Sequence, residues 1–195
     1  MPTDLLMIRH GQSVWNAERR WQGQADPPLS ELGELQARTG AERLTASFDA
    51  VIASDLERAS RTAELLTGRS PELNPAFRER HAGAWQGLTR DEIDAQAPDW
   101  QTTGWRPEGF EADDDLIERV LPAMNALASR ADAHTTQTLL VATHGGVIRS
   151  LDRHLGAPDD AIGNLSGRWY HFDEGGWAAG IHVELASDVT LTELE

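Results

Sequence analysis

The sequence predicts an α/β fold, a three-layer α/β/α sandwich around a mostly parallel central sheet. Residues 5–8 and 138–143 are apolar runs of strand length with the pattern of buried strands. Segments of strand character alternate along the chain with segments of helical periodicity, which is typical of a sheet with helices on its faces. A chain of 195 residues is long enough for one large core, so we expect a single domain, residues 1–195.

The individual elements are predicted from periodicity and from capping residues. Strands are expected over residues 5–8, 50–53, 138–143, 168–172 and 179–184. Helices are expected from Ser30 to near Ser47, from Ser54 to Gly68, from Thr89 as a short helix, from Leu116 to Leu127 and from Val147 to Leu155. Ser54 with Glu57, and Thr89 with Glu92, have the spacing of a capping box. Residues 97–115 have little periodicity and are expected to cross the active face.

The formal net charge is −15, which disfavours nucleic acid and anionic membranes at long range, so neither is expected as a partner. A phosphorylated substrate would be repelled as well. A phosphate site therefore requires a local concentration of positive charge. All 17 basic residues are arginine, whose guanidinium binds phosphate through paired hydrogen bonds. A compositional preference for arginine explains the missing lysine equally well, so the bias alone indicates no function.

The chain contains no cysteine. This excludes disulfides, thiolate metal sites and cysteine nucleophiles, and it is compatible with a reducing cytoplasm. The sequence has no apolar run of about 18 residues, and residues 1–4 lead into the first strand without the features of a secretion signal. We therefore expect a cytoplasmic protein.

Two buried-strand segments end at a histidine that is followed by glycine, at residues 9–11 (Arg-His-Gly) and at residues 144–146 (His-Gly-Gly). In open α/β sheets the reactive groups gather beyond the carboxyl ends of the strands. The helix expected after residues 144–146 would also offer free backbone N–H groups to an anion. The two segments together indicate a site, although an ordinary strand end explains either one alone.

A third basic group is expected near the same edge of the sheet. Arg58 lies at the entrance of the helix that follows the strand over residues 50–53, and Arg61 and Thr62 share its face. An arginine in the first turns of a helix is as often simply solvated. Five tryptophans fall in segments expected over the active face, where they are either an aromatic wall for the substrate or packing anchors: Trp15, Trp21, Trp85, Trp100 and Trp105.

These residues have the chemistry that phosphate monoester hydrolysis requires. His10 can act as a nucleophile if its imidazole is neutral. Arg9, Arg58 and His144 as an imidazolium, together with backbone N–H groups, can neutralise the phosphoryl oxygens. Glu79 is suited to give the leaving group its proton and then to activate water. This chemistry requires no metal ion and no cofactor.

Four motifs, in this order, resemble those of the histidine phosphatase superfamily, also called the phosphoglycerate-mutase-like family. They are Arg-His-Gly at residues 9–11, Ser-Asp-Leu-Glu-Arg-Ala-Ser-Arg-Thr-Ala at residues 54–63, Glu-Arg-His-Ala-Gly at residues 79–83 and Thr-His-Gly-Gly-Val-Ile-Arg at residues 143–149. They span most of the chain. The four together are specific, whereas any one alone is a weak signal. The resemblance implies the phosphoglycerate-mutase-like version of the predicted fold.

The resemblance also implies a role for each matching residue. The first histidine of the family is phosphorylated, which corresponds to His10 with Arg9 beside it. Arg58 is placed on the phosphate, Glu79 is the proton donor and His144 is the second histidine. Positions that bind the substrate are matched by Asn16, Gln22, Gly23 and Gly145.

The expected activity is metal-independent hydrolysis of a small phosphorylated metabolite, a sugar phosphate or a phosphoglycerate-like compound. A cofactor-dependent mutase of the phosphoglycerate type is the alternative, and a non-catalytic phosphate-binding module is a third reading. Arg90 stands where mutases carry a lysine, which favours the mutase. Ala82 replaces their tyrosine, and residues 97–115, with Arg106 as the only cation, lack their paired arginines. A homodimer is left open.

Overall fold

A six-stranded sheet forms the centre of the computed structural model, which describes residues 2–130, 136–158, 160–186 and 188–190. The strands are β1 (Thr3–Arg9), β2 (Ala50–Ala53), β3 (Glu72–Leu73), β4 (Gln137–Thr143), β5 (Ser166–Asp173) and β6 (Gly176–Glu184). Their order in the sheet is β3-β2-β4-β1-β5-β6. The strands from β3 to β1 pair in parallel, and β5 and β6 continue the sheet as an antiparallel hairpin. The prediction of a mostly parallel sheet is confirmed.

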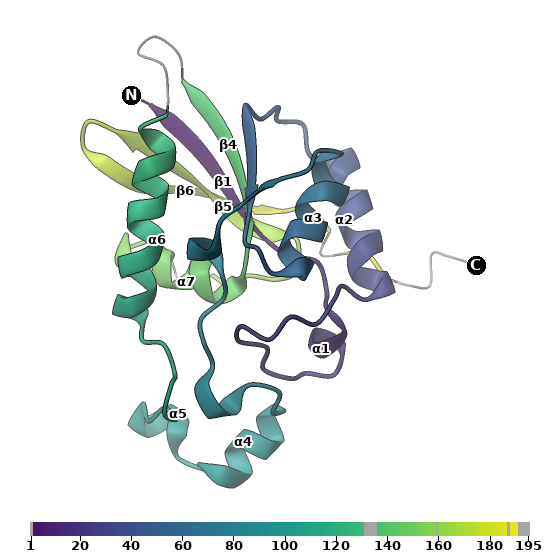
Figure 1. Cartoon of the computed structure of the whole chain (residues 1–195), viewed down its shortest axis with the longest axis vertical. Coiled ribbons are helices and arrows are strands. Elements are labelled where there is room, and N and C mark those ends of the chain that lie inside the picture. The colour runs from purple at the N-terminus through teal and green to yellow at the C-terminus, as the bar shows by residue number, and fades with distance from the viewer. Residues whose placement is uncertain (1, 131–135, 159, 187, 191–195) are drawn as a thin grey trace.

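Helices cover both faces of this sheet, as Figure 1 shows. They are α1 (Val14–Ala17), α2 (Glu31–Arg43), α3 (Glu57–Thr67), α4 (Arg90–Gln96), α5 (Trp100–Thr103), α6 (Asp113–Ala128) and α7 (Gly145–His154). The pair α2 and α3 lies on one side of the sheet, and the pair α6 and α7 lies on the other. The three-layer α/β/α arrangement is therefore confirmed.

The alternation of side chains along β1 divides the interior into two cores. Leu5 and Met7 point to one face and pack in the cluster that contains the apolar residues of α6 and α7. Leu6 and Ile8 point to the other face and pack in the cluster that contains the apolar residues of α3. All four side chains are fully buried. A strand covered on both faces reads as a continuous apolar run, which is why the sequence marks β1 so clearly.

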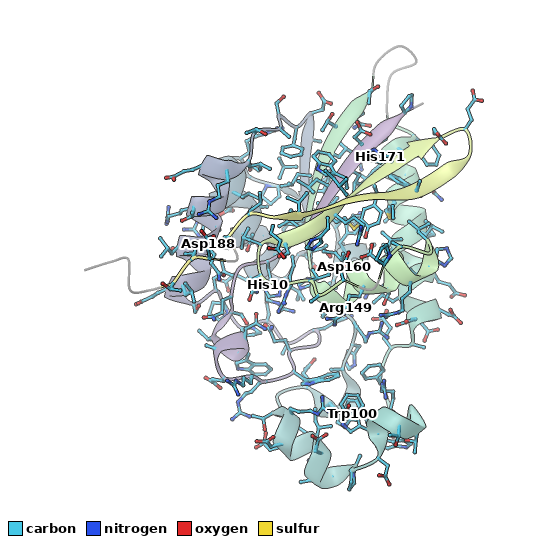
Figure 2. The ribbon with its side chains drawn as sticks, turned by 180° about the vertical axis from the view of Figure 1, so that it is seen from behind. His10, Trp100, Arg149, Asp160, His171 and Asp188 are labelled. Atoms are coloured by element: carbon cyan, nitrogen blue, oxygen red, sulfur yellow. The ribbon has the colours of Figure 1, made fainter. Side chains whose placement is uncertain are left out.

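A third and smaller cluster lies apart from the sheet, where α4 and α5 form a cap at one end of the molecule (Figure 2). Trp85, Ile93 and Trp100 are its buried members, and Trp21 packs against them from the loop after β1. Trp85 and Trp100 are therefore packing anchors, whereas Trp105 is 53% exposed. The irregular excursion expected over residues 97–115 includes α5 and the first turn of α6.

Two helix starts differ from the sequence prediction. Ser54 does not cap α3, whose N-cap is Leu56 without a side-chain hydrogen bond. The Ser54 hydroxyl accepts the Leu56 N–H instead, at 3.3 Å, so the chain turns once before the helix begins. Helix α6 begins at Asp113, ahead of the apolar periodicity, because its acidic first turn favours the positive end of the helix dipole. Pro122 lies inside α6.

Other local predictions are confirmed. Ser30 caps α2 by accepting the Gly33 N–H, and Thr89 with Glu92 forms the capping box of α4. Among the described residues, no helix is long and apolar enough to cross a membrane.

Candidate active site

The parallel pairing of β1 with β4 brings the two glycine-flanked histidines together. Arg9 lies opposite Thr143 in the register, so the residue after each strand occupies the same edge of the sheet. The His10 N–H donates to the Thr143 carbonyl at 3.0 Å, which extends the ladder by one bond. The imidazole rings of His10 and His144 lie with their centroids 5.2 Å apart and their planes at 64°.

His10 is held in one orientation by its two ring nitrogens. Nδ1 lies 2.6 Å from the Gly11 carbonyl oxygen, and a carbonyl only accepts, so Nδ1 carries the proton. Nε2 keeps its lone pair and accepts from Arg58 Nε at 3.2 Å. Burial, followed by the charges of Arg58 and Arg9, lowers the pKa of His10 well below its usual value. The free site therefore presents a neutral imidazole whose nucleophilic nitrogen faces a guanidinium.

Arg58, which donates to His10 Nε2, is buried and held by backbone carbonyls. Its side chain is fully buried, and its Nη1 and Nη2 donate to the carbonyls of Ala25 and Gly23 at 2.7 and 3.0 Å. Burial lowers the pKa of Arg58 to about 10, so it is still a cation at neutral pH. Gly23 has φ +54°, in the region that favours glycine. Its carbonyl orients Arg58, a role that the sequence pattern alone did not indicate.

Arg9 is the second cation beside the histidines. Its Nη1 donates to the Ile162 carbonyl at 2.7 Å, and burial lowers the pKa of Arg9 to about 10. The first residue of α7, Gly145, packs against it, because a Cβ at Gly145 would lie 3.3 Å from Arg9 Cδ. Gly145 itself does not line the pocket, whereas Gly146 does. The structure thus places Gly145 beside Arg9 and beneath the pocket surface.

Glu79 is fixed by two backbone N–H groups. Its Oε2 accepts from Gly146 N at 3.1 Å, and its Oε1 accepts from Arg80 N at 2.8 Å. A Cβ at Gly146 would overlap the Glu79 carboxylate. The second glycine after His144 is therefore required for the carboxylate to reach the start of α7.

His144 differs from its expected state. Its side chain is fully buried, and neither ring nitrogen has a hydrogen-bond partner among the described residues. Burial lowers the pKa of His144 well below its usual value, and Arg58, His10 and Arg9 lower it further. The lowered pKa does not favour the expected imidazolium in the free protein, chiefly because the ring is buried and also because guanidinium groups lie nearby. Buried polar groups normally have a hydrogen-bond partner, so the two ring nitrogens of His144 are available to a ligand at this edge of the sheet.

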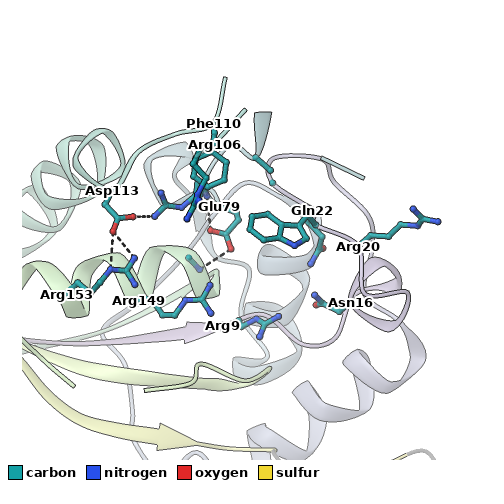
Figure 3. Close-up of a pocket in the computed structure, with 15 residues that line it drawn as sticks. Arg9, Asn16, Arg20, Gln22, Glu79, Arg106, Phe110, Asp113, Arg149 and Arg153 are labelled. Carbon is teal, nitrogen blue, oxygen red and sulfur yellow. Dashed lines mark hydrogen bonds and ion pairs between the residues drawn. The ribbon is translucent and has the colours of Figure 1, made fainter. Parts of the chain in front are cut away.

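A pocket of about 540 Å³ opens above these groups (Figure 3). Its lining includes five of the residues predicted from the sequence: Arg9, Asn16, Gln22, Gly23 and Glu79. His10, Arg58 and His144 lie buried outside that lining. Asn16 Oδ1 and Gln22 Oε1 each accept from Ser13, from its N–H and its hydroxyl, which fixes both amides at the rim.

Asn164 is a positioning residue that sequence reasoning missed. Its Nδ2 donates to the His10 carbonyl at 2.9 Å and to Asn16 Oδ1 at 3.4 Å, which ties the nucleophile strand to the rim. The next residue, Leu165, has φ +54° and donates its N–H to the Arg9 carbonyl. A leucine in this region is strained, and such strain gathers at functional sites. A single asparagine in a loop carries no periodic or capping signal that could have revealed it.

Positive charge dominates the remaining lining. Five further arginines line the pocket, and the sequence analysis assigned none of them to it: Arg20, Arg80, Arg106, Arg149 and Arg153. Within the described ranges, no group of three or more His, Cys, Asp or Glu residues is placed to hold a metal ion. The pocket therefore suits an anion that is bound by guanidinium groups and backbone N–H groups.

The family model of the histidine phosphatase superfamily (branch 1) matches residues 5–181. The chain belongs to the histidine phosphatase superfamily. This membership confirms the resemblance that the motifs predicted, and the match covers all of the site residues described above.

Named relatives of this histidine phosphatase include other phosphatases. A glucosyl-3-phosphoglycerate phosphatase of Mycobacterium tuberculosis is 37% identical over 92% of this chain and 89% of its own length. A metal-independent phosphoserine phosphatase of Arabidopsis thaliana is 37% identical over 76% of this chain and 67% of its own length. The structure of a mycobacterial glucosyl-3-phosphoglycerate phosphatase with VO3 has a TM-score of 0.81 at 32% identity, covering 91% of this chain and 97% of that one. Proteins named as phosphoglycerate mutases match as well, at 33 to 34% identity.

The two depressed histidine pKa values predict a pH-dependent stability. The unfolded chain protonates both imidazoles below about pH 6.5, whereas the folded chain keeps them neutral. The free energy of unfolding should therefore fall as the pH is lowered from 6.5 to 5, by up to about 1.4 kcal/mol per pH unit for each histidine. Urea unfolding at a series of pH values measures this dependence. The free energy of unfolding of the double variant His10→Gln, His144→Gln should change less with pH than that of the wild type.

The control is His154→Gln, which removes an exposed histidine at the end of α7 and should keep the wild-type slope. Equal slopes in the wild type and the double variant would mean that the two buried imidazoles take up protons in the folded state.

Proposed function

We propose that this histidine phosphatase hydrolyses phosphate monoesters of small metabolites, sugar phosphates or phosphoglycerate-like compounds, through a phosphohistidine at His10 and without a metal ion. The observation that carries the proposal is the neutral Nε2 of His10 facing the buried guanidinium of Arg58, beside a pocket that Glu79 lines. The phosphatase names of several relatives support the same reaction, and two of those names refer to a glycosylated phosphoglycerate and to phosphoserine.

In the first step, His10 Nε2 attacks the phosphorus atom while the bond from phosphorus to the ester oxygen breaks. The proton stays on Nδ1 and remains hydrogen-bonded to the Gly11 carbonyl. This hydrogen bond stabilises the positive charge that develops on the ring. The protonated carboxyl of Glu79 gives its proton to the ester oxygen, so the product leaves as an alcohol. The phosphoryl oxygens are negatively charged throughout the transfer, and Arg9 and Arg58 stabilise that charge.

In the second step, water attacks the phosphohistidine. The Glu79 carboxylate, now without its proton, accepts one from that water, and inorganic phosphate leaves Nε2 of His10. His144 has two unpartnered ring nitrogens among the described residues. We propose that a phosphoryl oxygen supplies the missing partner, and that the charge of the bound dianion favours the imidazolium form of His144 during turnover.

Phosphoryl transfer to a second substrate hydroxyl is the alternative, and the mutase names among the relatives give it support. It requires a second anion site that holds a bisphosphorylated intermediate and excludes water. Arg106, the only cation of residues 97–115, already donates to the carbonyls of Trp100 and Trp105 and stacks on aromatic rings of the cap. We therefore propose that water is the usual acceptor.

The remaining expectations become proposals about the cellular setting. The absence of cysteine is compatible with a cytoplasmic location, and the net charge of −15 disfavours nucleic acid and anionic membranes as partners. A homodimer is left open, because nothing in the site requires a second copy.

His10→Gln tests the nucleophile. The variant should lose at least about a thousandfold in kcat on p-nitrophenyl phosphate, the scale expected when a covalent catalyst is removed. The assay is run with EDTA present, which should not change the wild-type rate. Rapid acid-free quenching of the wild type during turnover should trap acid-labile, base-stable phosphate on the protein. Turnover by a folded His10→Gln variant above that level would rule out His10 as the nucleophile.

Glu79→Gln tests the proton donor. A general acid contributes more when the leaving oxygen is more basic. The loss in kcat/KM should therefore be larger with an alkyl phosphate such as glycerol 3-phosphate than with p-nitrophenyl phosphate, whose phenolate hardly needs a proton. Equal losses on the two esters would remove Glu79 from this role.

The choice between hydrolysis and isomerisation is tested with 3-phosphoglycerate and catalytic 2,3-bisphosphoglycerate. Both isomers and free phosphate are followed over time. Phosphate release should outrun isomerisation. Isomerisation faster by more than about tenfold, a partition of roughly 1.4 kcal/mol, would make the protein a mutase.

A further inference from the structure

The arginines that line the pocket are not equivalent. Four of the five that the sequence analysis missed are held by acceptors within the protein: Arg20 by Glu18 and the Gly87 carbonyl, Arg80 and Arg153 by Asp113, and Arg106 by cap carbonyls. Arg149 makes no hydrogen bond, ion pair or ring contact with any residue that the structure describes, and it is exposed. It is therefore the one cation of this lining, in the described chain, that has no acceptor of its own.

Arg149 lies close to the reacting groups. It is near the start of α7, three residues after Gly146, so it shares a helix face with the N–H that holds Glu79. Figure 3 shows its guanidinium beside that of Arg9, below the Glu79 carboxylate. The charge of Arg149 also lowers the pKa of Arg9, which means that the two cations act on each other. Glu79 offsets part of this repulsion at Arg9, and a bound anion beside the two guanidinium groups would offset more of it.

We infer that Arg149 binds a carboxylate of the substrate, one that is attached close to the phosphorylated carbon. The inference rests on the proposed function and narrows its substrate class to phosphorylated hydroxy acids and their derivatives. The phosphoryl group lies at His10 and the ester oxygen at Glu79. The first carbons of the leaving group therefore pass over the start of α7, where Glu79 contacts Gly146 and where Arg149 is the next side chain into the pocket.

The charge of the site favours a carboxylate over a second phosphate. A guanidinium binds a carboxylate through two parallel hydrogen bonds, and the charges are then equal and opposite. A phosphate dianion would need a further cation. Arg80 and Arg153 already share Asp113, and Arg106 is occupied by the cap. Arg149 therefore matches a group with a single negative charge.

Two substrates that differ only at this group test the inference. 3-Phosphoglycerate and glycerol 3-phosphate are both phosphate esters of a primary alcohol, and a carboxylate in the first replaces a hydroxymethyl group in the second. The measured quantity is the selectivity, defined as kcat/KM with the carboxylate ester divided by kcat/KM with glycerol 3-phosphate. The wild type should prefer the carboxylate ester. Arg149→Gln should lower the selectivity by about tenfold or more, chiefly because the carboxylate ester binds more weakly and its Michaelis constant rises.

Two further variants sharpen the comparison. Arg149→Lys keeps the charge and loses the paired geometry, so its selectivity should lie between those of the wild type and Arg149→Gln. Arg38→Gln removes one exposed arginine from α2, where it pairs with Glu34, and should keep the wild-type selectivity. A fall with Arg38→Gln equal to that with Arg149→Gln would mean that net charge, rather than a contact, sets the preference, and would overturn the inference.

The remaining outcomes separate the inference from the proposed function. If Arg149→Gln loses the same factor on both substrates, or if the wild type shows no preference for the carboxylate, Arg149 does not bind this group while the phosphatase function stands. If the wild type releases no phosphate from either compound or from p-nitrophenyl phosphate, the proposed function fails and the inference fails with it. Circular dichroism of each variant confirms that the fold is intact.

Discussion

The parallel pairing of β1 with β4 is the constraint on which the rest of the site depends. It sets Arg9 opposite Thr143, so each strand delivers a histidine to the same edge of the sheet. Both strands are buried on two faces, and a shift in their register would turn apolar side chains out of two separate cores. Hydrophobic packing far from the pocket therefore maintains the distance between the two imidazoles. The rigid core thus fixes the positions of the reacting groups.

Burial beside cations gives the site its charge state. His10 and His144 are buried beside guanidinium groups, which lowers the pKa of both imidazoles, so both are neutral in the free site. The arginines are in turn held by backbone carbonyls, such as those of Ile162 and Ala25, which do not cancel their charge. A chain with a net charge of −15 can thus attract a phosphate ester, because the field at short range has the opposite sign to the field of the whole protein.

The sequence predicted the elements that have a periodic or continuous apolar pattern and the site residues that lie in recognisable motifs. Long apolar runs fixed the expectation for β1 and β4, and the glycine-flanked histidines placed His10 and His144 at their ends. What it missed depends on contacts between distant segments. Asn164 contacts His10 across 154 positions. The exposed Arg149 differs from the other arginines of the pocket in having no acceptor within the described part of the chain. The Ser54 capping box was mistaken because the hydroxyl had a nearer donor at Leu56.

The overlap between a Cβ at position 146 and the Glu79 carboxylate has a consequence for how such a site can diverge. A side chain at position 146 would displace the Glu79 carboxylate from the Gly146 N–H that holds it. The glutamate loop and the start of α7 are thus coupled, and they can change only together. The cap has its own small core of Trp85, Ile93 and Trp100, and the segment that leaves it contacts the glutamate loop, where Glu111 accepts the His81 N–H. A cap that accepts a new alcohol therefore has to keep its contact with the glutamate loop, because Glu79 and the start of α7 function as one unit.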